Sequence, residues 1–321
     1  MPEESPLRVA LLAGGKSGER EVSLAGAREL ERALDPARYR VTRYDPATDI
    51  ARLASDVEAI DVAFILLHGR FGEDGTVQGF LDLLGVPYQG SGVLGSALAM
   101  DKDAAKAVYQ SHGLPVSPWQ MAKKTDAEDP SPLLSSLTFP VVVKPVRQGS
   151  SLGMSVAHTP IELANAIAKA FEYDQEVMVE QYVRGREITV GVIGNQELTA
   201  LPLVEIIPGE GHNFFDYQAK YQAGASREIC PAQVSEAIRC TAQDYAIRAH
   251  RALRLRGYSR TDMIVTDDGG LVLLETNTIP GMTPTSLLPQ AAAAAGMPFP
   301  TLLERLLELA LEAKSPGPGT R

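Results

Sequence analysis

An acidic turn near the C-terminal end constrains the fold of this chain more than any other feature. Asp268-Gly269 lies between two apolar runs, and this dipeptide in that context strongly predicts a β-hairpin. If the turn is centred between Asp268 and Gly269, Asp262 lies directly opposite Glu275, whether the loop has two or four residues. The sequence therefore brings two carboxylates together on neighbouring strands.

The same pairing sets Arg260 opposite Asn277. Because side chains alternate along a strand, all four residues share one face at the end of the hairpin. Carboxylate and amide oxygens are hard ligands that suit Mg²⁺, which binds few carboxylates and completes its shell with phosphate oxygens. An exposed hairpin with a surface salt bridge is the alternative. We favour a metal site, because the apolar runs indicate burial on both faces, where unpaired acids are costly.

The N-terminal part of the chain alternates strands with helices. Residues 7–13 and 61–67 are short apolar runs, and helical patterns follow them at 22–34 and 76–84. Such alternation predicts a parallel sheet covered on both faces, with ligands at the carboxyl ends of the strands.

Beyond Met100 the pattern changes. A helix is expected over residues 101–112, and the strands that follow come in close succession, which predicts antiparallel sheets in an α+β arrangement. These strands are expected at residues 139–143, 176–180, 187–193 and 198–207. Residues 300–313 carry leucines at helical spacing.

Two segments lack periodicity. Residues 209–226 are polar and contain glycine, and a loop of that length is usually functional or disordered. The tail at 315–321 is expected to be disordered.

A glycine- and serine-rich segment follows one predicted strand. Lys144 closes the strand, and Ser150 and Ser151 lie in the segment, which ends at Gly153. Such a tip lets backbone N–H groups approach an anion that Lys144 would neutralise. By itself the segment is equally well explained as a plain turn with a solvated lysine. Combined with the acidic hairpin, it predicts the basic half of a metal-nucleotide site.

The charge balance argues against nucleic-acid and membrane partners. The formal net charge is −10, whereas phosphate backbones and anionic membranes are bound by clustered Lys and Arg. The opening residues lack a signal-peptide pattern, and no run approaches the ~18 apolar residues of a membrane span. Cys230 and Cys240, the only cysteines, flank a helical pattern that would hold them too far apart for a disulfide. We therefore expect a soluble, cytoplasmic protein with reduced thiols.

Taken together, these stretches resemble the D-alanine–D-alanine ligase family of the ATP-grasp superfamily. Residues 68–79 fit one family signature throughout, and residues 260–281 fit a second nearly throughout. Thr261 and Thr276 stand where the family usually has apolar residues, and they are expected to face each other away from the ligands. The likeness covers roughly residues 8–313.

The resemblance implies an ATP-grasp fold of classes α/β and α+β. An N-terminal parallel-sheet domain over residues 1–101 would be followed by two α+β domains, 102–186 and 187–314, that hold ATP between them. Residues 315–321 would form the tail.

It also implies an enzyme. The expected activity is ATP-dependent joining of two D-alanines through a D-alanyl phosphate, for peptidoglycan precursors. The expected partners are D-alanine, ATP and two Mg²⁺ ions, with Mn²⁺ as a substitute, a monovalent cation in some members, and a second copy of the chain in a homodimer. The loop at 209–226 is expected to be mobile without ligand and to order over the site when ATP binds.

By resemblance, each site residue receives a role. Metal ligands would be Asp262, Glu275 and Asn277. Residues expected at the nucleotide are Lys102, Lys144, Ser150, Ser151, Glu180, Gln181, Val183, Glu187 and Lys220. Residues expected at the two D-alanines are Glu19, His68, Ser286, Lys220 and Tyr221. Catalysis is expected from Glu19, Ser150, Tyr221, Arg260 and the Gly281 N–H, with Arg260 and Gly281 stabilising an oxyanion.

Two other functions stay open at this level. One is a different ATP-grasp ligase that uses another acid or amine. The other is a nucleotide-binding regulatory protein without turnover, which the intact acidic triad and Arg260 disfavour.

Overall fold

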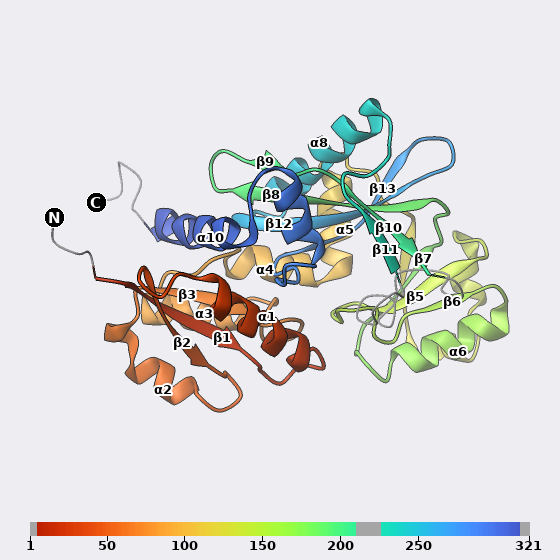
Figure 1. The fold of residues 1–321 in the computed structure, drawn as a ribbon. Coiled ribbons are helices and arrows are strands. Elements are labelled where there is room, and N and C mark those ends of the chain that lie inside the picture. The colour runs from red at the N-terminus through yellow and green to blue at the C-terminus, as the bar shows by residue number, and fades with distance from the viewer. Residues whose placement is uncertain (1–4, 210–225, 315–321) are drawn as a thin grey trace.

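The computed structural model describes residues 5–209 and 226–314. The expectations for Lys220, for Tyr221, for most of the loop at 209–226 and for the tail at 315–321 lie outside these ranges. Three separate sheets organise the described residues, and each takes its strands from one continuous part of the chain (Figure 1).

The N-terminal sheet is parallel, in the order β2-β1-β3. Its strands are β1 (Leu7–Ala13), β2 (Tyr39–Tyr44) and β3 (Val62–Leu66). Alternate residues of β1 pack to opposite sides: Leu11 packs with Leu30 of α1 (Arg20–Ala33), and Leu12 with Leu81 of α3 (Thr76–Leu84). Both faces are therefore covered, as the alternation of strands and helices predicts. Four more helices pack on this sheet: α2 (Ile50–Ser55), η1 (Val57–Ala59), α9 (Leu287–Ala294) and α10 (Phe299–Lys314).

The central sheet is antiparallel, in the order β4-β7-β5-β6. Its strands are β4 (Trp119–Ala122), β5 (Val141–Pro145), β6 (Ser155–Ala157) and β7 (Val177–Gln181). One face packs on α6 (Pro160–Ala170) and on the short helices η2 (Lys124–Ala127) and η3 (Ser131–Ser135). The other face is left for the site described below.

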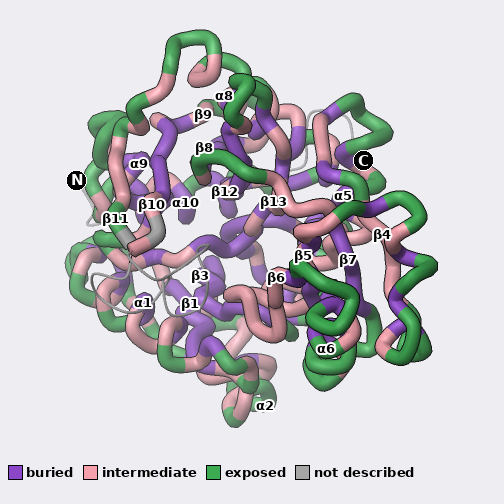
Figure 2. Tube along the Cα trace, turned by 90° about the vertical axis from the view of Figure 1, so that its right-hand side faces the viewer, coloured by how far each residue is buried: buried purple, intermediate pink, exposed green. Residues whose placement is uncertain are grey.

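The large sheet runs β11-β10-β8-β12-β13, with β9 paired to β8. Its strands are β8 (Arg186–Gly194), β9 (Thr199–Ala200), β10 (Val204–Pro208), β11 (Ser226–Ile229), β12 (Gly257–Val265) and β13 (Leu271–Asn277). Helices α5 (Lys102–Ser111) and α8 (Glu236–Ala252) pack on one face, next to α4 (Val93–Met100), and α9 contacts the other. Figure 2 shows the strands of this sheet as a largely buried layer.

Most predicted elements are confirmed, and several boundaries are wrong. The helix at 76–84 is found with those limits, and the helix at 101–112 is one residue shorter at each end because Asp101 and His112 are its caps. The strand expected at 198–207 is interrupted, since β9 ends at Ala200 and β10 begins at Val204. Pro202 lies in the gap and has no N–H to donate to a ladder.

Both cysteines are free thiols, as expected. Cys230 follows β11, and the helix that contains Cys240 begins only at Glu236. Among the described residues, no helix has the length and apolar character needed to cross a bilayer.

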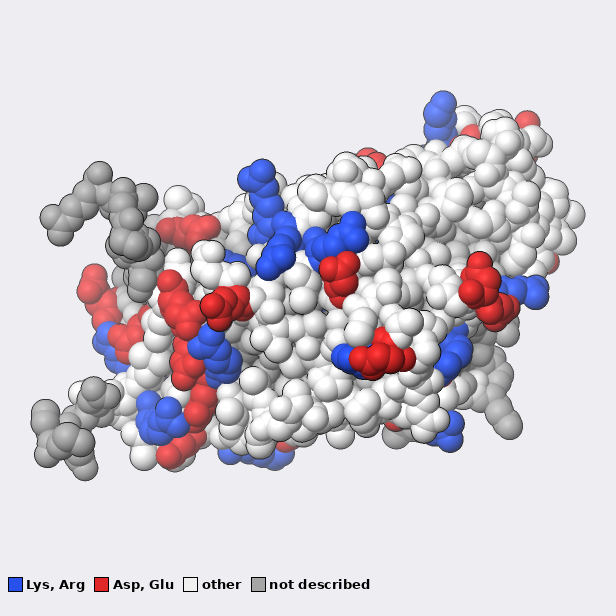
Figure 3. All heavy atoms as spheres, turned by 90° about the horizontal axis from the view of Figure 1, so that it is seen from above, with Lys and Arg blue, Asp and Glu red and all other residues white. Residues whose placement is uncertain are grey.

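Acidic and basic side chains are interspersed on the face drawn in Figure 3. Exposed ion pairs are common among the described residues, for example Arg305 with Glu308 at 3.0 Å. Pairs of this kind contribute little to stability because water and salt screen them. The ion pairs of Glu180 with Lys106 and Lys144, in contrast, are buried.

Candidate active site

The acidic hairpin forms as β12 and β13, with one correction to its predicted register. Asp262 pairs with Glu275 and Arg260 with Asn277, as expected. Nearer the turn the pairing shifts by one residue, so that Met263 faces Leu273 and a bulge falls between Met263 and Asp262. The loop is longer than the predicted two or four residues, since it spans all of 266–270. Bulges occur often beside active sites, where they change the direction of a side chain.

The hairpin gathers its polar ends around Asp262, which is 4% exposed. Arg260 donates to both Asp262 oxygens, at 2.9 and 2.8 Å, and the amide nitrogen of Asn277 donates to Oδ2 at 3.1 Å. From β8, the Thr189 hydroxyl donates to Oδ1 at 2.5 Å. Residues on three strands therefore fix this carboxylate in place, and no sequence pattern indicates the part played by Thr189.

The two threonines face each other on the opposite side, as predicted. The Thr261 and Thr276 hydroxyls lie 3.0 Å apart, and Tyr109 of α5 donates to Thr276 at 2.7 Å. Tyr109 is fully buried, and burial raises the pKa of its hydroxyl well above the usual value. A satisfied hydroxyl chain thus replaces apolar packing behind the acidic face.

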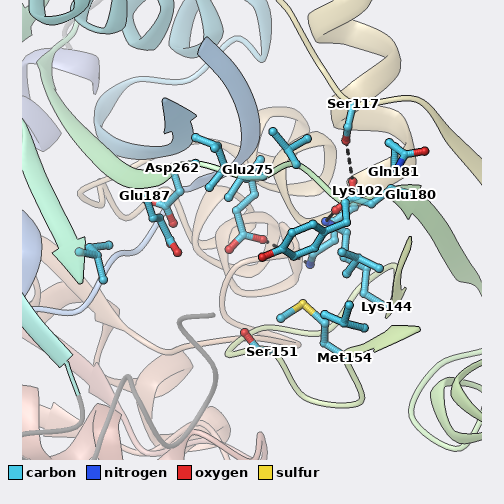
Figure 4. Close-up of a pocket in the computed structure, with 18 of the residues that line it drawn as sticks. Lys102, Ser117, Lys144, Ser151, Met154, Glu180, Gln181, Glu187, Asp262 and Glu275 are labelled. Atoms are coloured by element: carbon cyan, nitrogen blue, oxygen red, sulfur yellow. Dashed lines mark hydrogen bonds and ion pairs between the residues drawn. The ribbon is translucent and has the colours of Figure 1, made fainter. Parts of the chain in front are cut away.

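A cavity of about 470 Å³ lies between the central and large sheets. Figure 4 shows Asp262, Glu187 and Glu275 on one side of it, and Lys144, Glu180 and Gln181 on the other. The predicted nucleotide and metal residues that line it are Lys102, Lys144, Ser150, Ser151, Glu180, Gln181, Val183, Glu187, Asp262 and Glu275. Asn277 instead lines a small neighbouring cavity of about 30 Å³, which shares Lys102 and Glu275 with the large one.

Lys102 connects the basic segment to the acidic hairpin. Its ammonium lies 3.6 Å from Glu275 and donates to the Gln148 carbonyl at 2.8 Å. Ser150 and Ser151 have backbone φ angles of +50° and +57°, in the left-handed region that residues other than glycine rarely adopt. Strain of this kind is often retained at ligand sites, and successive left-handed residues help to turn N–H groups toward an anion.

Glu180 holds two lysines inside the molecule. Its Oε1 accepts from Lys144 at 2.6 Å and its Oε2 from Lys106 at 2.8 Å, and Ser117 donates to Oε2 at 3.3 Å. Burial alone would raise the pKa of Glu180, but Lys144 and Lys106 lower it to about 2. Burial also lowers the pKa of Lys106. The negative charge of Glu180 raises this pKa, and the positive charge of Lys144 lowers it further. Neither Lys106 nor Ser117 was predicted from the sequence.

Gln181 contacts protein rather than open cavity with its side-chain amide. Its oxygen accepts from the Thr138 N–H at 3.0 Å, and its nitrogen donates to the Thr138 and Pro140 carbonyls at 2.8 and 3.1 Å. This amide is therefore fully used in holding the start of β5. The Gln181 N–H donates to the Pro118 carbonyl at 2.9 Å, so its backbone carbonyl is the one group that Gln181 can offer a nucleotide. Val183 and Glu187 line the cavity from the link into β8.

Glu19 lies where three loops meet. Ser150 donates to its carboxylate, and the α-carbons of Gly69 and Gly149 approach so closely that a Cβ would lie 3.1 and 2.9 Å from its Oε2. His68 is 7% exposed, and its Nδ1 lies 3.1 Å from the Ile279 carbonyl. Burial lowers the pKa of His68, although the nearby Glu19 raises it, and the net effect favours the neutral imidazole. The structure thus brings Glu19 to Ser150 and sets His68 near Glu19.

Gly281 and Ser286 also come together. A Cβ on Gly281 would meet the Ser286 hydroxyl oxygen at 3.0 Å, and that oxygen lies 2.8 Å from the Thr283 hydroxyl. Ser286 is the residue before α9, so its hydroxyl stands at a helix N-terminus, where carboxylates are favoured.

Glu73 is a further residue whose part in the site could not be predicted from the sequence. Its oxygens accept from the backbone N–H of Gly69 at 2.7 Å and, from the other side, of Ile279 at 3.3 Å. Burial, followed by the negative charge of Glu19, raises the pKa of Glu73 to about 8. This carboxyl therefore ties the loop after β3 to the loop after β13.

The hairpin residues fit a divalent cation by the chemistry of their donors. Among the described residues, no three His, Cys, Asp or Glu side chains cluster closely enough to hold a metal by themselves. The hairpin supplies two carboxylates, and its third donor is an amide. A site with so few protein ligands is typical of Mg²⁺ that shares its shell with nucleotide phosphates.

Two family models match most of the chain. The model described as the D-ala D-ala ligase N-terminus matches residues 43–91, and that described as the D-ala D-ala ligase C-terminus matches residues 108–308.

Individual relatives agree with this match. A D-alanine–D-alanine ligase of Desulfotalea psychrophila is 61% identical over 97% of this chain and 97% of its own length. Among solved structures, a Bacillus anthracis D-alanine–D-alanine ligase complexed with ATP is similar with a TM-score of 0.83, at 32% identity over 96% of this chain and 98% of that one. The VanG D-Ala:D-Ser ligase of Enterococcus faecalis is similar with a TM-score of 0.83, at 31% identity over 95% of this chain and 100% of that one.

Proposed function

Because the chain belongs to the D-alanine–D-alanine ligase family, we propose how its own residues perform the reaction of that family. It is an enzyme with an ATP-grasp fold, and it joins two D-alanines at the expense of ATP. The product is a peptidoglycan precursor. The observation that carries the proposal is the single cavity on which Asp262, Glu275, Lys102 and Lys144 converge.

ATP is proposed to occupy the cavity between the central and large sheets. Lys102 and Lys144 would bind its phosphates, together with the backbone of Ser150 and Ser151, and Lys220 would join them from outside the described residues. Glu180, Gln181, Val183 and Glu187 would surround the adenine and ribose. Since the side-chain amide and the N–H of Gln181 are already used, a hydrogen bond to the base at that residue would be accepted by its backbone carbonyl.

A divalent metal accompanies ATP, and we assign it to Asp262, Glu275 and Asn277. The proposed ions are two Mg²⁺, with Mn²⁺ as a substitute, because all the donors are oxygens. When bound, they would spread the negative charge of the transferred phosphoryl group. A monovalent cation is proposed as an additional ligand.

The reaction is proposed to run in two steps. The carboxylate of the first D-alanine attacks the γ-phosphorus, which releases ADP and leaves a D-alanyl phosphate. The amine of the second D-alanine, after losing a proton, attacks that carbonyl and expels phosphate. Lys102 and Lys144 compensate the charge of the phosphoryl group in the first step.

The substrate residues would divide their work between the two D-alanines. Glu19, oriented by Ser150, would bind the ammonium of the first, with His68 beside it. Ser286 would anchor the carboxylate of the second. Arg260 and the Gly281 N–H would stabilise the tetrahedral oxyanion. Lys220 and Tyr221, outside the described residues, would contact the phosphate and the Ser150 region.

The organisation of the protein is proposed on the same basis. Residues 1–101, 102–186 and 187–314 would be its three domains, and a homodimer in the cytoplasm its working form. Size determination in solution would test the dimer.

Mixing the protein with MgATP and D-alanine tests the proposal directly. Phosphate release that depends on D-alanine, with formation of the dipeptide, is the expected outcome. Release with another amino acid only would point to a different carboxylate-amine ligase, and nucleotide binding without release to a regulatory protein. Because one structural relative is a D-Ala:D-Ser ligase, D-serine is offered in competition, and D-alanyl-D-alanine is expected to predominate.

A further inference from the structure

Lys106 is a buried cation for which the proposed reaction has no use. It is 1% exposed, it comes from α5, and it donates to Glu180 at 2.8 Å and to Ser117 at 2.9 Å. Its ammonium also lies 5.3 Å from the centre of the Trp119 ring. Lys144, Glu180 and Ser117 line the large cavity, but Lys106 does not. Lys106 can therefore affect a ligand there only through the lining groups that it contacts, Glu180 and Ser117.

The fold explains why these groups meet. On β5 and β7, Val142 pairs with Glu180 and Lys144 with Met178, so Lys144 and Glu180 are diagonal neighbours on one face of the central sheet. Lys106 reaches the same carboxylate from α5, one helical turn beyond Lys102. Figure 4 shows Glu180 and Lys144 on the same side of the cavity, with Ser117 bonded to Glu180.

One carboxylate therefore serves two ammonium groups. A buried carboxylate left without a cation is strongly unfavourable. If Glu180 had Lys144 as its only partner, moving Lys144 to a phosphate would leave the buried charge uncompensated. With Lys106 in place, Glu180 keeps a cation and a hydroxyl donor when Lys144 moves.

We propose that Lys106 is a positioning residue that allows Lys144 to leave Glu180 and bind the nucleotide phosphates. Without ligand, Glu180 holds Lys144 at the wall of the cavity. When the nucleotide is bound, Lys144 contacts phosphate, and Lys106 alone neutralises Glu180. Loss of Lys106 would tighten the hold of Glu180 on Lys144 and so weaken phosphate binding selectively.

The inference rests on the proposed contact between Lys144 and phosphate, and its test needs no D-alanine. Calorimetric titrations measure the affinities of MgATP and of adenosine, which has no phosphates, for each folded variant. Their ratio isolates the phosphate contribution. The variants are Lys106→Met, Lys106→Arg and the double variant Lys106→Met with Glu180→Gln, and Lys169→Met on the exposed face of α6 is the control.

Lys106→Met is expected to lower the ratio of MgATP to adenosine affinity by about tenfold or more, the equivalent of one charged hydrogen bond. The double variant is expected to regain most of that ratio, because Glu180→Gln removes the charge that holds Lys144. Lys106→Arg and the control are expected to keep it.

An unchanged ratio in Lys106→Met would overturn the inference. The same holds for equal losses of MgATP and adenosine binding, or for a double variant as impaired as the single one. If Lys106→Met does not fold, Lys106→Arg becomes the test. This variant keeps the positive charge beside Glu180, so a tenfold or greater fall in its ratio of MgATP to adenosine affinity counts against the inference. Failure of the unaltered protein to bind MgATP would overturn the proposed function as well, whereas the other outcomes leave it intact.

Discussion

Replacing Glu180 by glutamine should destabilise the protein strongly in the absence of nucleotide. Glu180 is the carboxylate that compensates both Lys106 and Lys144, and the side chains of the three residues are 5%, 1% and 10% exposed. Removing one partner from a buried ionic group costs about 3 to 5 kcal/mol, because charge is left buried without compensation. At about 2 °C or somewhat more per kcal/mol for a chain of this size, the unfolding midpoint should fall by roughly 6 to 10 °C.

The loss should depend on pH in a defined direction. Burial lowers the pKa of Lys106 in the folded protein, and the variant lacks the carboxylate that raises it. As pH rises toward the usual lysine range, the folded state releases protons before the unfolded state does, so folding of the variant becomes more favourable. The difference from the unaltered protein should therefore narrow between about pH 7 and pH 10.

Urea unfolding without nucleotide, followed at several pH values, measures both effects. Glu308→Gln, which removes an exposed partner of Arg305, is the matched control and should change little. A loss below about 1 kcal/mol for Glu180→Gln, or a loss that does not vary with pH, would refute the reasoning about a shared buried carboxylate.

Three further predictions concern the hairpin and its surroundings. Glu275→Ala should abolish turnover while Asp268→Ala at the exposed turn does not, and near-normal activity of Glu275→Ala in the dipeptide assay would contradict the metal assignment. The raised pKa of Glu73 adds stability that is present below about pH 4.5 and is lost as pH rises to about 8. Glu73→Gln should therefore gain stability relative to the unaltered protein between about pH 4.5 and 8, and parallel pH profiles of the unfolding midpoint would count against this. Thr276→Val should cost about 1 to 2 kcal/mol in urea unfolding because it breaks the chain to Tyr109, and adding Tyr109→Phe should cost less than the sum of the single losses.

The acidic face could be predicted from the sequence because strand alternation and turn chemistry are local rules. Those rules could not predict the bulge between Asp262 and Met263, or the five-residue loop at 266–270, in which Thr266 and Gly270 donate to Asp268. The five-residue loop shifts the strand pairing by one residue and the bulge shifts it back, so Asp262 still pairs with Glu275.

The buried lysine could not be predicted so directly. A lysine within a helix usually indicates an exposed position. The one sign of burial in the sequence is that Lys106 lies one turn after Lys102 and three residues before Tyr109, which is buried. Its partner Glu180 comes from a distant strand, and no local pattern connects the two. Thr189 was missed for the same reason, because its contact with Asp262 depends on the pairing of β8 with β12.

The N-terminal sheet was easier to predict than the substrate contacts around it. Buried strands such as residues 62–66 show as apolar runs. Glu73, in contrast, contacts Gly69 within its own loop but meets Ile279 only when loops from two sheets come together.

The most direct test of the central claim is the position of the metal relative to the hairpin. Crystals grown with ATP and Mn²⁺ would locate the ions by anomalous diffraction. We predict density between the bound phosphates and the carboxylates of Asp262 and Glu275, with Asn277 in the same shell. Ions bound elsewhere, with these two carboxylates turned away from the phosphates, would contradict it.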